Sequence, residues 1–396
     1  MMSGKKTFRS VLFVLVFALA VFMLSYAAYA DFNLEIYVDS QKLESEFDPF
    51  IEDGSTYVPL RAVAEKLGAD ISWDSERRTA VTVKDDVTAE LSSEKSSIYR
   101  NGEEVKIGRN PKIINDRMYV PLRAIAESFG YTVSYDGLRR IINISSGSLL
   151  KVHFLDCDQA DSSFLELPDG KCMLIDAGEK SFGQELVKFI KDAGYNKIDY
   201  VVATHPHADH IGGMAEVLNN FEVDTFFMPE KTHNTKTFED MLRALEKNGC
   251  EAVFIGQGDM LFDGEVKCVC LSPNEKEYVR LNNYSAVLRL SYRDVSILFS
   301  ADAEQDSEAQ MLASGLELDS DILKVGHHGS LTSSSEEYID AVSPEVAVIS
   351  VGKNNEYGFP AQHVLDMFGG RDTKVYRTDI HGNINLLTDG YIYTIE

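Results

Sequence analysis

Cysteine is scarce in this chain of 396 residues, and its distribution excludes a disulfide-stabilised fold. The five cysteines are an odd number spread over residues 157–270, whereas a disulfide framework needs an even number. Cys268 and Cys270 alternate in an apolar run, so they would share one face of a strand. We expect both to be core residues and assign no function to any cysteine.

Basic residues are also few relative to acidic ones. The chain has 38 Lys and Arg residues against 63 Asp and Glu, a net charge of −25. Residues 150–396 carry 20 against 42, a net of −22, and residues 31–149 carry 15 against 21, a net of −6. Such a surface repels a polyanion and offers no groove that follows phosphates. The composition therefore argues against general nucleic-acid binding, but it leaves room for a local phosphodiester site.

Long apolar runs are absent after the N-terminus. The one such run, residues 11–24, follows Lys5, Lys6 and Arg9 and precedes the small-residue pattern that ends at Ala30. This arrangement predicts a secretory signal peptide over residues 1–30, with an uncleaved membrane anchor as the alternative. No later stretch is long enough to span a bilayer. We expect the mature chain to be secreted or associated with the cell envelope.

The part of the chain after this signal contains a tandem duplication of one sequence unit. The sequence YVPLRAVAE at Tyr57 returns as YVPLRAIAE at Tyr119, an offset of 62 residues. The copies cover about residues 31–92 and 93–147. Each is predicted to hold a strand pair, a short helix that starts at its proline, and a second strand pair.

The duplicated region, over about residues 34–146, resembles the copper amine oxidase N-terminal domain, which occurs as tandem modules on exported bacterial proteins. In the first copy we expect Ile71 and Trp73 to alternate inward. Residues 31–147 contain neither His nor Cys, so the region lacks the ligands of a copper site. It is expected to be either an adhesion module for the cell wall or a bare spacer.

From Leu150 onward, short apolar runs alternate with amphipathic helices, which predicts an α/β domain over residues 150–396. Its strongest motif follows the apolar strand expected at residues 198–203. The motif has the spacing H-x-H-x-D-H and consists of His205, His207, Asp209 and His210. The first two side chains can hold one cation and the next two can reach a second. Mixed imidazole and carboxylate ligands suit Zn²⁺, with Mn²⁺ or Fe as options.

Two further motifs come directly after apolar strands. Asp302 follows the strand expected at residues 295–299, where a carboxylate can bridge two cations. His327 and His328 lie in the segment Lys-Val-Gly-His-His-Gly-Ser that begins at Lys324. Together with the first motif they contain five of the nine histidines, and this joint placement indicates one convergent site.

These motifs resemble the metallo-β-lactamase superfamily, and within it the extracellular hydrolase-like domain of the competence protein ComEC. The resemblance covers about residues 150–395. It implies a four-layer αββα sandwich with a metal pair at its rim, here preceded by the small duplicated α+β domain. Asn282 stands near the place where most of the superfamily has a third histidine for the first metal, as it does in the ComEC branch, so this difference concerns occupancy of that metal site. A departure from the branch itself concerns substrate contacts, because two histidines near the pocket mouth are lost at residues 358–362.

The resemblance also implies a role for each motif residue. One metal would be held by His205 and His207, the other by Asp209, His210 and His328, with Asp302 as the bridge. The implied catalytic residues are Asp209, Asp302 and His327. The implied second-shell or substrate contacts are Asp176, Asn282, Ser285 and Lys324.

The chemistry expected of such a site is hydrolysis by a metal-activated water. We expect an exported phosphodiesterase that uses two Zn²⁺ ions and acts on a small-molecule or cell-envelope phosphodiester. The alternatives are a nuclease of ComEC type, a lactonase or amide hydrolase for a small molecule, and a non-catalytic wall-binding protein.

Overall fold

The computed structural model describes residues 34–274 and 277–396. The signal peptide expected over residues 1–30 lies outside these ranges. Within them, no helix combines the length and apolar character needed to cross a membrane.

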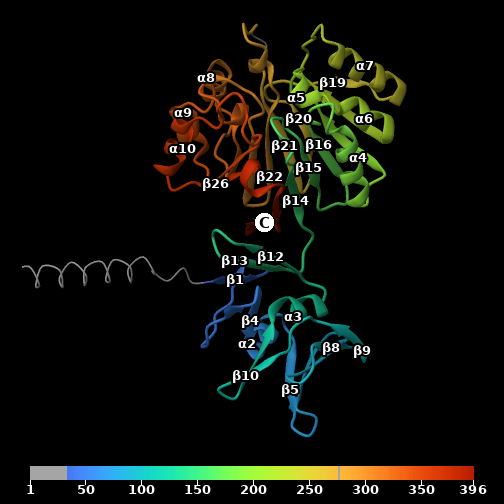
Figure 1. The fold of residues 1–396 in the computed structure, drawn as a ribbon, viewed down its shortest axis with the longest axis vertical. Helices are drawn as coiled ribbons and strands as arrows, with labels where there is room; N and C mark the ends of the chain where they lie inside the picture. Colours follow the sequence, from blue (N-terminus) through green and yellow to red (C-terminus); the bar gives the residue numbers. More distant parts are fainter. Residues whose placement is uncertain (1–33, 275–276) are drawn as a thin grey trace, which may run out of the picture.

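The N-terminal domain has three small sheets and two short helices, and lies below the larger domain in Figure 1. Sheet order is β12-β13-β1-β2 in the first sheet, β10-β11-β4-β3 in the second and β5-β6-β7-β8-β9 in the third. The elements are β1 (Glu35–Val38), β2 (Gln41–Lys42), β3 (Phe50–Glu52), β4 (Ser55–Pro59), α2 (Leu60–Lys66), β5 (Asp70–Asp74), β6 (Thr79–Lys84), β7 (Val87–Ser92), β8 (Ser97–Arg100), β9 (Glu103–Lys106), β10 (Lys112–Ile114), β11 (Arg117–Pro121), α3 (Leu122–Ser128), β12 (Thr132–Asp136) and β13 (Ile141–Ser145).

The two sequence copies interlock. Strands β4 and β11 are duplicates of each other and pair antiparallel, with Val58 opposite Val120, its own counterpart 62 residues later. Strand β1 of the first copy pairs in parallel with β13 of the second. The copies share one core cluster, so they fold as a single domain.

Each short helix begins directly after its proline. Helix α2 follows Pro59, and its apolar stripe is buried beneath the sheets. Gly68 adopts a φ of 77° after the last turn, a conformation that favours glycine. The expectation for Trp73 was wrong, because its side chain is 50% exposed. The face of β5 that carries Ile71 and Trp73 borders a cavity beside α2, and Ile71 reaches only the edge of the core.

The larger domain is built on two sheets, as Figure 1 shows. The first, of eight strands, has the order β19-β18-β17-β16-β15-β14-β27-β28, and the second, of seven, has the order β20-β21-β22-β23-β24-β25-β26. The strands are β14 (Leu150–Phe154), β15 (Ser163–Glu166), β16 (Cys172–Ile175), β17 (Lys197–Val202), β18 (Glu222–Met228), β19 (Ala252–Phe254), β20 (Met260–Asp263), β21 (Val266–Ser272), β22 (Val287–Tyr292), β23 (Val295–Phe299), β24 (Ile322–Lys324), β25 (Val346–Ile349), β26 (Lys374–Arg377), β27 (Ile384–Thr388) and β28 (Tyr393–Ile395). The helices are α4 (Gly183–Asp192), α5 (Ala208–Ile211), α6 (Met214–Asn220), α7 (Lys236–Asn248), α8 (Gln305–Ser314), α9 (Glu336–Val342), α10 (Gln362–Gly369) and α11 (Thr378–His381), with 3₁₀ turns η1 (Leu281–Tyr284) and η2 (Gly326–Gly329).

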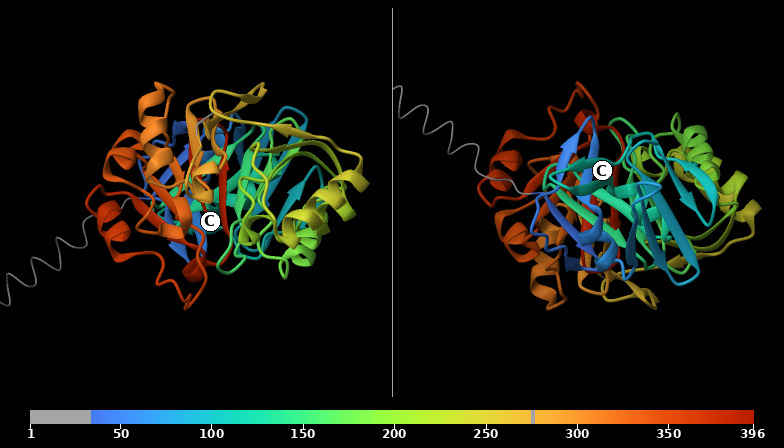
Figure 2. Two further views of the ribbon diagram at one scale, coloured as in Figure 1. Left: turned by 90° about the horizontal axis from the view of Figure 1, so that it is seen from above. Right: turned by 90° about the horizontal axis from the view of Figure 1, so that it is seen from below.

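Three apolar clusters hold these layers together. The central cluster takes side chains from both sheets, including Cys268 and Cys270, which are buried and unpaired. A second cluster lies between the first sheet and helices α4, α6 and α7, and a third lies between the second sheet and α8, α9 and α10. Figure 2 shows the sheets between the two groups of helices. The expected α/β fold of this half is confirmed.

The two domains meet at the C-terminal strand. Asp136 is fully buried and accepts hydrogen bonds from the Tyr376 hydroxyl at 2.9 Å and the Ile395 amide at 3.3 Å. The guanidinium of Arg139 lies over the Tyr393 ring, 3.8 Å from its centroid. The serine-rich segment that connects the two domains also contacts the larger domain, since the carbonyl of Ser148 accepts a hydrogen bond from the Tyr292 hydroxyl.

Candidate metal centre

The histidine motif lies where parallel strand β17 leaves the sheet. Buried apolar residues hold the strand to Val202, and the chain then turns outward so that His205 and His207 project from the loop. Helix α5 follows at once and carries Asp209 and His210. All four motif side chains therefore lie at the carboxyl end of the first sheet, where ligands gather in α/β folds.

One group of possible ligands consists of His205, His207 and Asp302, whose ligand atoms lie within 4.8 Å of one another. Nε2 of His205 is 3.0 Å from Nδ1 of His207 and 3.8 Å from Oδ2 of Asp302. Nitrogen ligands at about 2.0 Å from a tetrahedral cation stand about 3.3 Å apart. The separations in this group match one small cation.

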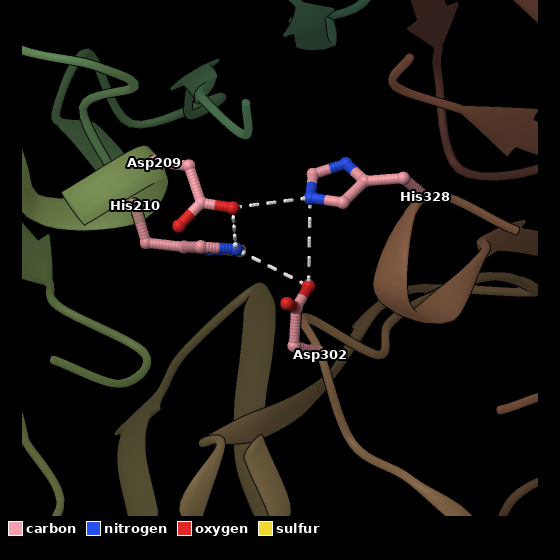
Figure 3. A group of neighbouring side chains, drawn as sticks. All are labelled: Asp209, His210, Asp302 and His328. Carbon is pink, nitrogen blue, oxygen red and sulfur yellow. Dashed lines mark ion pairs between the residues drawn. The ribbon is translucent and has the colours of Figure 1, made fainter. Parts of the chain in front are cut away.

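A second group consists of Asp209, His210, Asp302 and His328, drawn in Figure 3. Nε2 of His210 lies 3.2 Å from Oδ1 of Asp302 and 3.8 Å from Oδ2 of Asp209. Nε2 of His328 lies 3.5 Å from the same Asp209 oxygen. Two imidazoles and two carboxylates thus converge on one point.

Asp302 belongs to both groups. Its Oδ2 faces His205, whereas its Oδ1 faces His210 and His328. The residue follows β23 and is only 2% exposed. Ser285 accepts a hydrogen bond from the Asp302 amide at 3.3 Å, which helps to fix this loop. The carboxylate is therefore placed to be shared by two cations.

Hydrogen bonds to the far ring nitrogens fix the orientation of the imidazoles. His210 donates from Nδ1 to Asp176 at 2.7 Å, and His328 donates from Nδ1 to the carbonyl of Ser350 at 2.9 Å. Each contact leaves Nε2 facing the centre. Such outer contacts set the tautomer and the basicity of a metal-binding histidine.

Thr204 connects Asp176 to the first group. Its hydroxyl donates to Asp176 at 2.6 Å, so the same oxygen accepts from Nδ1 of His205 at 3.2 Å. Asp176 therefore orients ligands of both groups.

The backbone around the centre is strained at several points. Asp176, Ala301, His327 and His328 all have positive φ values, between 46° and 59°. Non-glycine residues adopt this region at a cost, and such residues cluster at functional sites. Gly213 shows how closely the loops approach, because a Cβ there would lie 2.4 Å from the carbonyl of Ala177.

His327 lies at the open edge of the centre and is farther from the second group than His328. Its ring is 21% exposed, and its Nε2 is 3.7 Å from Oδ2 of Asp302. Thr332 donates to the buried Glu304 at 2.9 Å, so it accepts from Nδ1 of His327 at 3.1 Å. The lone pair on Nε2 then faces Asn282, whose amide nitrogen lies 3.3 Å away.

Lys324 is buried, contrary to the ordinary behaviour of a lysine at a strand end. Its Nζ donates to Asp161 at 2.8 Å, and both side chains are less than a tenth exposed. An oxygen of Asp161 lies 3.8 Å from Nδ1 of His328. Lys324 thus supports the loop behind the second group and lies too deep to meet a substrate.

The charges at the centre favour a cation. Burial lowers the pKa of His205 well below its usual range and also lowers that of His207, so both stay neutral. Burial opposes ionisation of His210 and Asp302 too. For His210, however, the surrounding carboxylates hold the pKa well above its usual range. For Asp302, the surrounding histidines hold the pKa of the carboxyl well below its usual range. His210 therefore carries a proton when no cation is bound, and a metal ion would replace that proton, because a histidine ligand must be neutral and a carboxylate ligand charged.

A metal pair fits these residues. Three buried atoms that face the second group, Nε2 of His210, Nε2 of His328 and Oδ1 of Asp302, find no hydrogen-bond partner among the described residues. Buried polar atoms without a partner are costly, and an ion supplies what they lack. The donor set suits divalent metals that accept nitrogen and oxygen ligands.

Sequence reasoning gave no role to four residues that support this centre: Asp161, Thr204, Glu304 and Thr332. Thr204 directly precedes the histidine motif, which was the one available signal. The remaining histidines serve elsewhere. His153 contacts Asn385 and Glu166 far from the centre, and His363 and His381 are exposed. The ring of His233 lies 6.1 Å from that of His207, beyond ligand range.

Comparison with known proteins identifies both halves. The family model for the copper amine oxidase N-terminal domain matches residues 37–144. ComE operon protein 3 of Bacillus subtilis (strain 168) is 30% identical over 251 residues, which are 59% of this chain and 32% of that protein. Competence protein ComA of Neisseria gonorrhoeae is 30% identical over 212 residues, 53% of this chain and 28% of that protein. The chain spans less than a third of either relative.

Among solved structures, the metallo-beta-lactamase fold protein YhfI from Bacillus subtilis aligns with a TM-score of 0.41 and 12% identity, covering 63% of this chain and all of that one. The family model for the metallo-beta-lactamase superfamily matches residues 155–353, half of the chain, and this stretch contains every residue of the two ligand groups. The chain belongs to the metallo-β-lactamase superfamily, whose fold holds divalent metal ions, and carries a copper amine oxidase N-terminal domain before that fold.

Proposed function

We propose that this protein is an exported phosphodiesterase that works with two Zn²⁺ ions. The observation that carries the proposal is the position of Asp302, whose two oxygens face two separate ligand groups. Paired cations a few ångströms apart suit displacement at phosphorus, because they can stabilise both the attacking and the leaving oxygen.

His205, His207 and Asp302 would hold one ion, and Asp209, His210, His328 and Asp302 the other. When bound, the ions activate water and neutralise charge that develops on the phosphoryl group. The side chains and loops of the chain hold the ligands in position. Asp176 and the Ser350 carbonyl bind Nδ1 of His210 and of His328, so that Nε2 of each ring points to the place where the ion would bind.

His327 is the group best placed to meet the substrate. Its Nδ1 proton is held by Thr332, which in turn is held by Glu304, so Nε2 is left as an acceptor at the open edge. A neutral imidazole held in this way can accept a proton from an attacking water or from a substrate hydroxyl. Asn282 donates toward the same nitrogen and keeps the ring in place.

Charge favours a small substrate. The larger domain has a net charge of −22, which repels a long polyanion but has little effect on one phosphodiester at a cationic centre. A nuclease is the second candidate. It is favoured by the names of the relatives, which include Recombination protein 2 of Haemophilus influenzae, 27% identical over 241 residues.

The test is turnover by the purified, zinc-loaded full chain on bis-p-nitrophenyl phosphate, on single- and double-stranded DNA, and on a panel of lactones. The proposal expects hydrolysis of the phosphodiester, and an Asp302→Ala variant should lose it. Preference for DNA would favour the nuclease. Turnover of lactones alone would overturn the phosphodiesterase.

Export and retention form a separate part of the proposal. Residues 1–30 would direct export, and the duplicated domain would hold the enzyme at the cell wall. Fractionation of cells that express the full chain tests this, and a chain found only in the cytoplasm would contradict it.

A further inference from the structure

The duplicated domain contains a cavity of about 700 Å³ that the proposed hydrolysis does not use. It lies in the N-terminal domain, between helix α2, strand β5 and the loop after β2. Its wall includes Trp73, which is 50% exposed and is the only tryptophan of the chain. The volume is that of a pocket for a small ligand or for a few units of a polymer.

Comparison of the two sequence copies shows that the strand bearing Trp73 packs within its own domain, whereas the equivalent strand of the second copy contacts the other domain. The counterpart of Trp73 is Tyr135, on strand β12, whose amide donates a hydrogen bond to Glu396 at 3.0 Å. Strand β12 packs against β28 of the larger domain. The second copy therefore uses this surface to join the domains, whereas the first copy keeps it open and has a larger aromatic ring there.

Two aromatic side chains, Phe47 and Trp73, are among those that line the cavity. The ring of Phe47 lies under the guanidinium of Arg117, which is 3.5 Å from the ring centroid. Arg117, Phe47 and Trp73 all line the same space. Because Trp73 is half exposed and lines the cavity, its indole offers apolar surface to a ligand that enters there. Such rings recognise ligands that have a flat apolar face of their own.

Polar groups surround the rings in equal numbers of each sign. The lining contains four basic and four acidic side chains, so its formal charge is zero. They include Lys66, which donates to Gln41 at 3.0 Å, and Arg61, which pairs with Glu65 at 3.4 Å. Exposed contacts of this type are weak and exchange readily for a ligand's hydrogen bonds. A strongly charged ligand would meet as many like charges as opposite ones.

A sugar ring has both required properties, because its C–H face is apolar and its hydroxyl groups donate and accept hydrogen bonds. We infer that the cavity beside Trp73 binds a neutral glycan chain, with one sugar ring stacked on the indole and its hydroxyls bonded to the polar rim. The site would anchor the protein to a polysaccharide surface.

The single tryptophan makes the inference directly testable. The full chain is titrated with a soluble tetramer of β-1,4-linked N-acetylglucosamine while tryptophan emission is recorded, and calorimetry measures the affinity. We expect a saturable change in emission, and at least tenfold weaker binding of the anionic tetramer of galacturonic acid. No emission change and no heat with either sugar would overturn the inference.

Variants separate this site from other surfaces. Trp73→Ala should weaken calorimetric binding of the neutral tetramer at least tenfold, whereas Tyr391→Ala, at a ring 49% exposed on the larger domain, should leave it unchanged. Trp73 is not packed in the core, so circular dichroism should show a folded variant. Equal binding by Trp73→Ala would contradict the assignment. Stronger binding of a tyrosine-rich peptide than of the tetramer would replace the glycan by a peptide.

Discussion

The carboxylate of Asp176 lies 2.7 Å from Nδ1 of His210, and both side chains are buried. Asp176 is not within either ligand group, yet it determines which nitrogen of His210 faces the metal centre. Through Thr204 it also orients His205. One carboxylate behind the centre therefore supports ligands of both cations.

Asp176→Asn should weaken zinc binding about 10–100-fold while the fold is kept. The reason is that an amide cannot accept hydrogen bonds from both His210 and Thr204 as the carboxylate does. The measurement is a competition titration of the apo chain against a chromogenic zinc chelator. Asp319→Asn, at an exposed position, is the matched control and should bind zinc as the unmodified chain does. Unchanged affinity in Asp176→Asn would show that His210 needs no such support.

Lys324→Met should lower the free energy of unfolding by about 3–5 kcal/mol, because Asp161 would remain as an uncompensated buried charge. The double variant Lys324→Met with Asp161→Leu should recover much of that loss, since it removes both charges. Urea denaturation followed by circular dichroism checks both. Lys353→Met, at an exposed lysine, is the control. A single variant as stable as the control would contradict the buried ion pair.

Asp136→Ala should lower the free energy of unfolding by about 3–5 kcal/mol and leave turnover unchanged, because it removes a buried carboxylate that joins the domains far from the metal centre. The duplicated domain offers an internal control. Asp74 makes the same contacts with Arg77 in the equivalent turn, but it is 28% exposed and meets no other domain. Asp74→Ala should therefore destabilise the fold much less than Asp136→Ala does. Equal losses in the two variants would show that the interface adds little.

Much of the site could be predicted because its ligands sit in short motifs directly after apolar strands. Strands β17, β23 and β24 bring those motifs together, with β23 antiparallel to β22 and parallel to β24, and the resemblance supplied their roles. His328, which the resemblance implied as a ligand, has its Nε2 3.5 Å from Oδ2 of Asp209 within the second ligand group, and its role stays a prediction.

Other features depend on contacts that local patterns cannot show. Lys324 is buried because its partner Asp161 comes from 163 residues earlier in the chain. Trp73 alternates with polar neighbours like a core residue, yet the face of its strand borders a cavity whose other wall comes partly from the second copy. The domain interface likewise joins Asp136 to the last strand of the chain.

The number of divalent ions bound per chain tests the central claim most directly. The apo full chain is titrated with Zn²⁺ in a calorimeter, and the loaded protein is analysed by elemental analysis after dialysis. We expect about two ions per chain, because Asp302 serves two ligand groups. In Asp302→Ala we expect fewer than one, with folding largely retained, because two close cations would lose their shared anion. A folded chain that binds one ion or none, or an Asp302→Ala variant that still binds two, would contradict that claim.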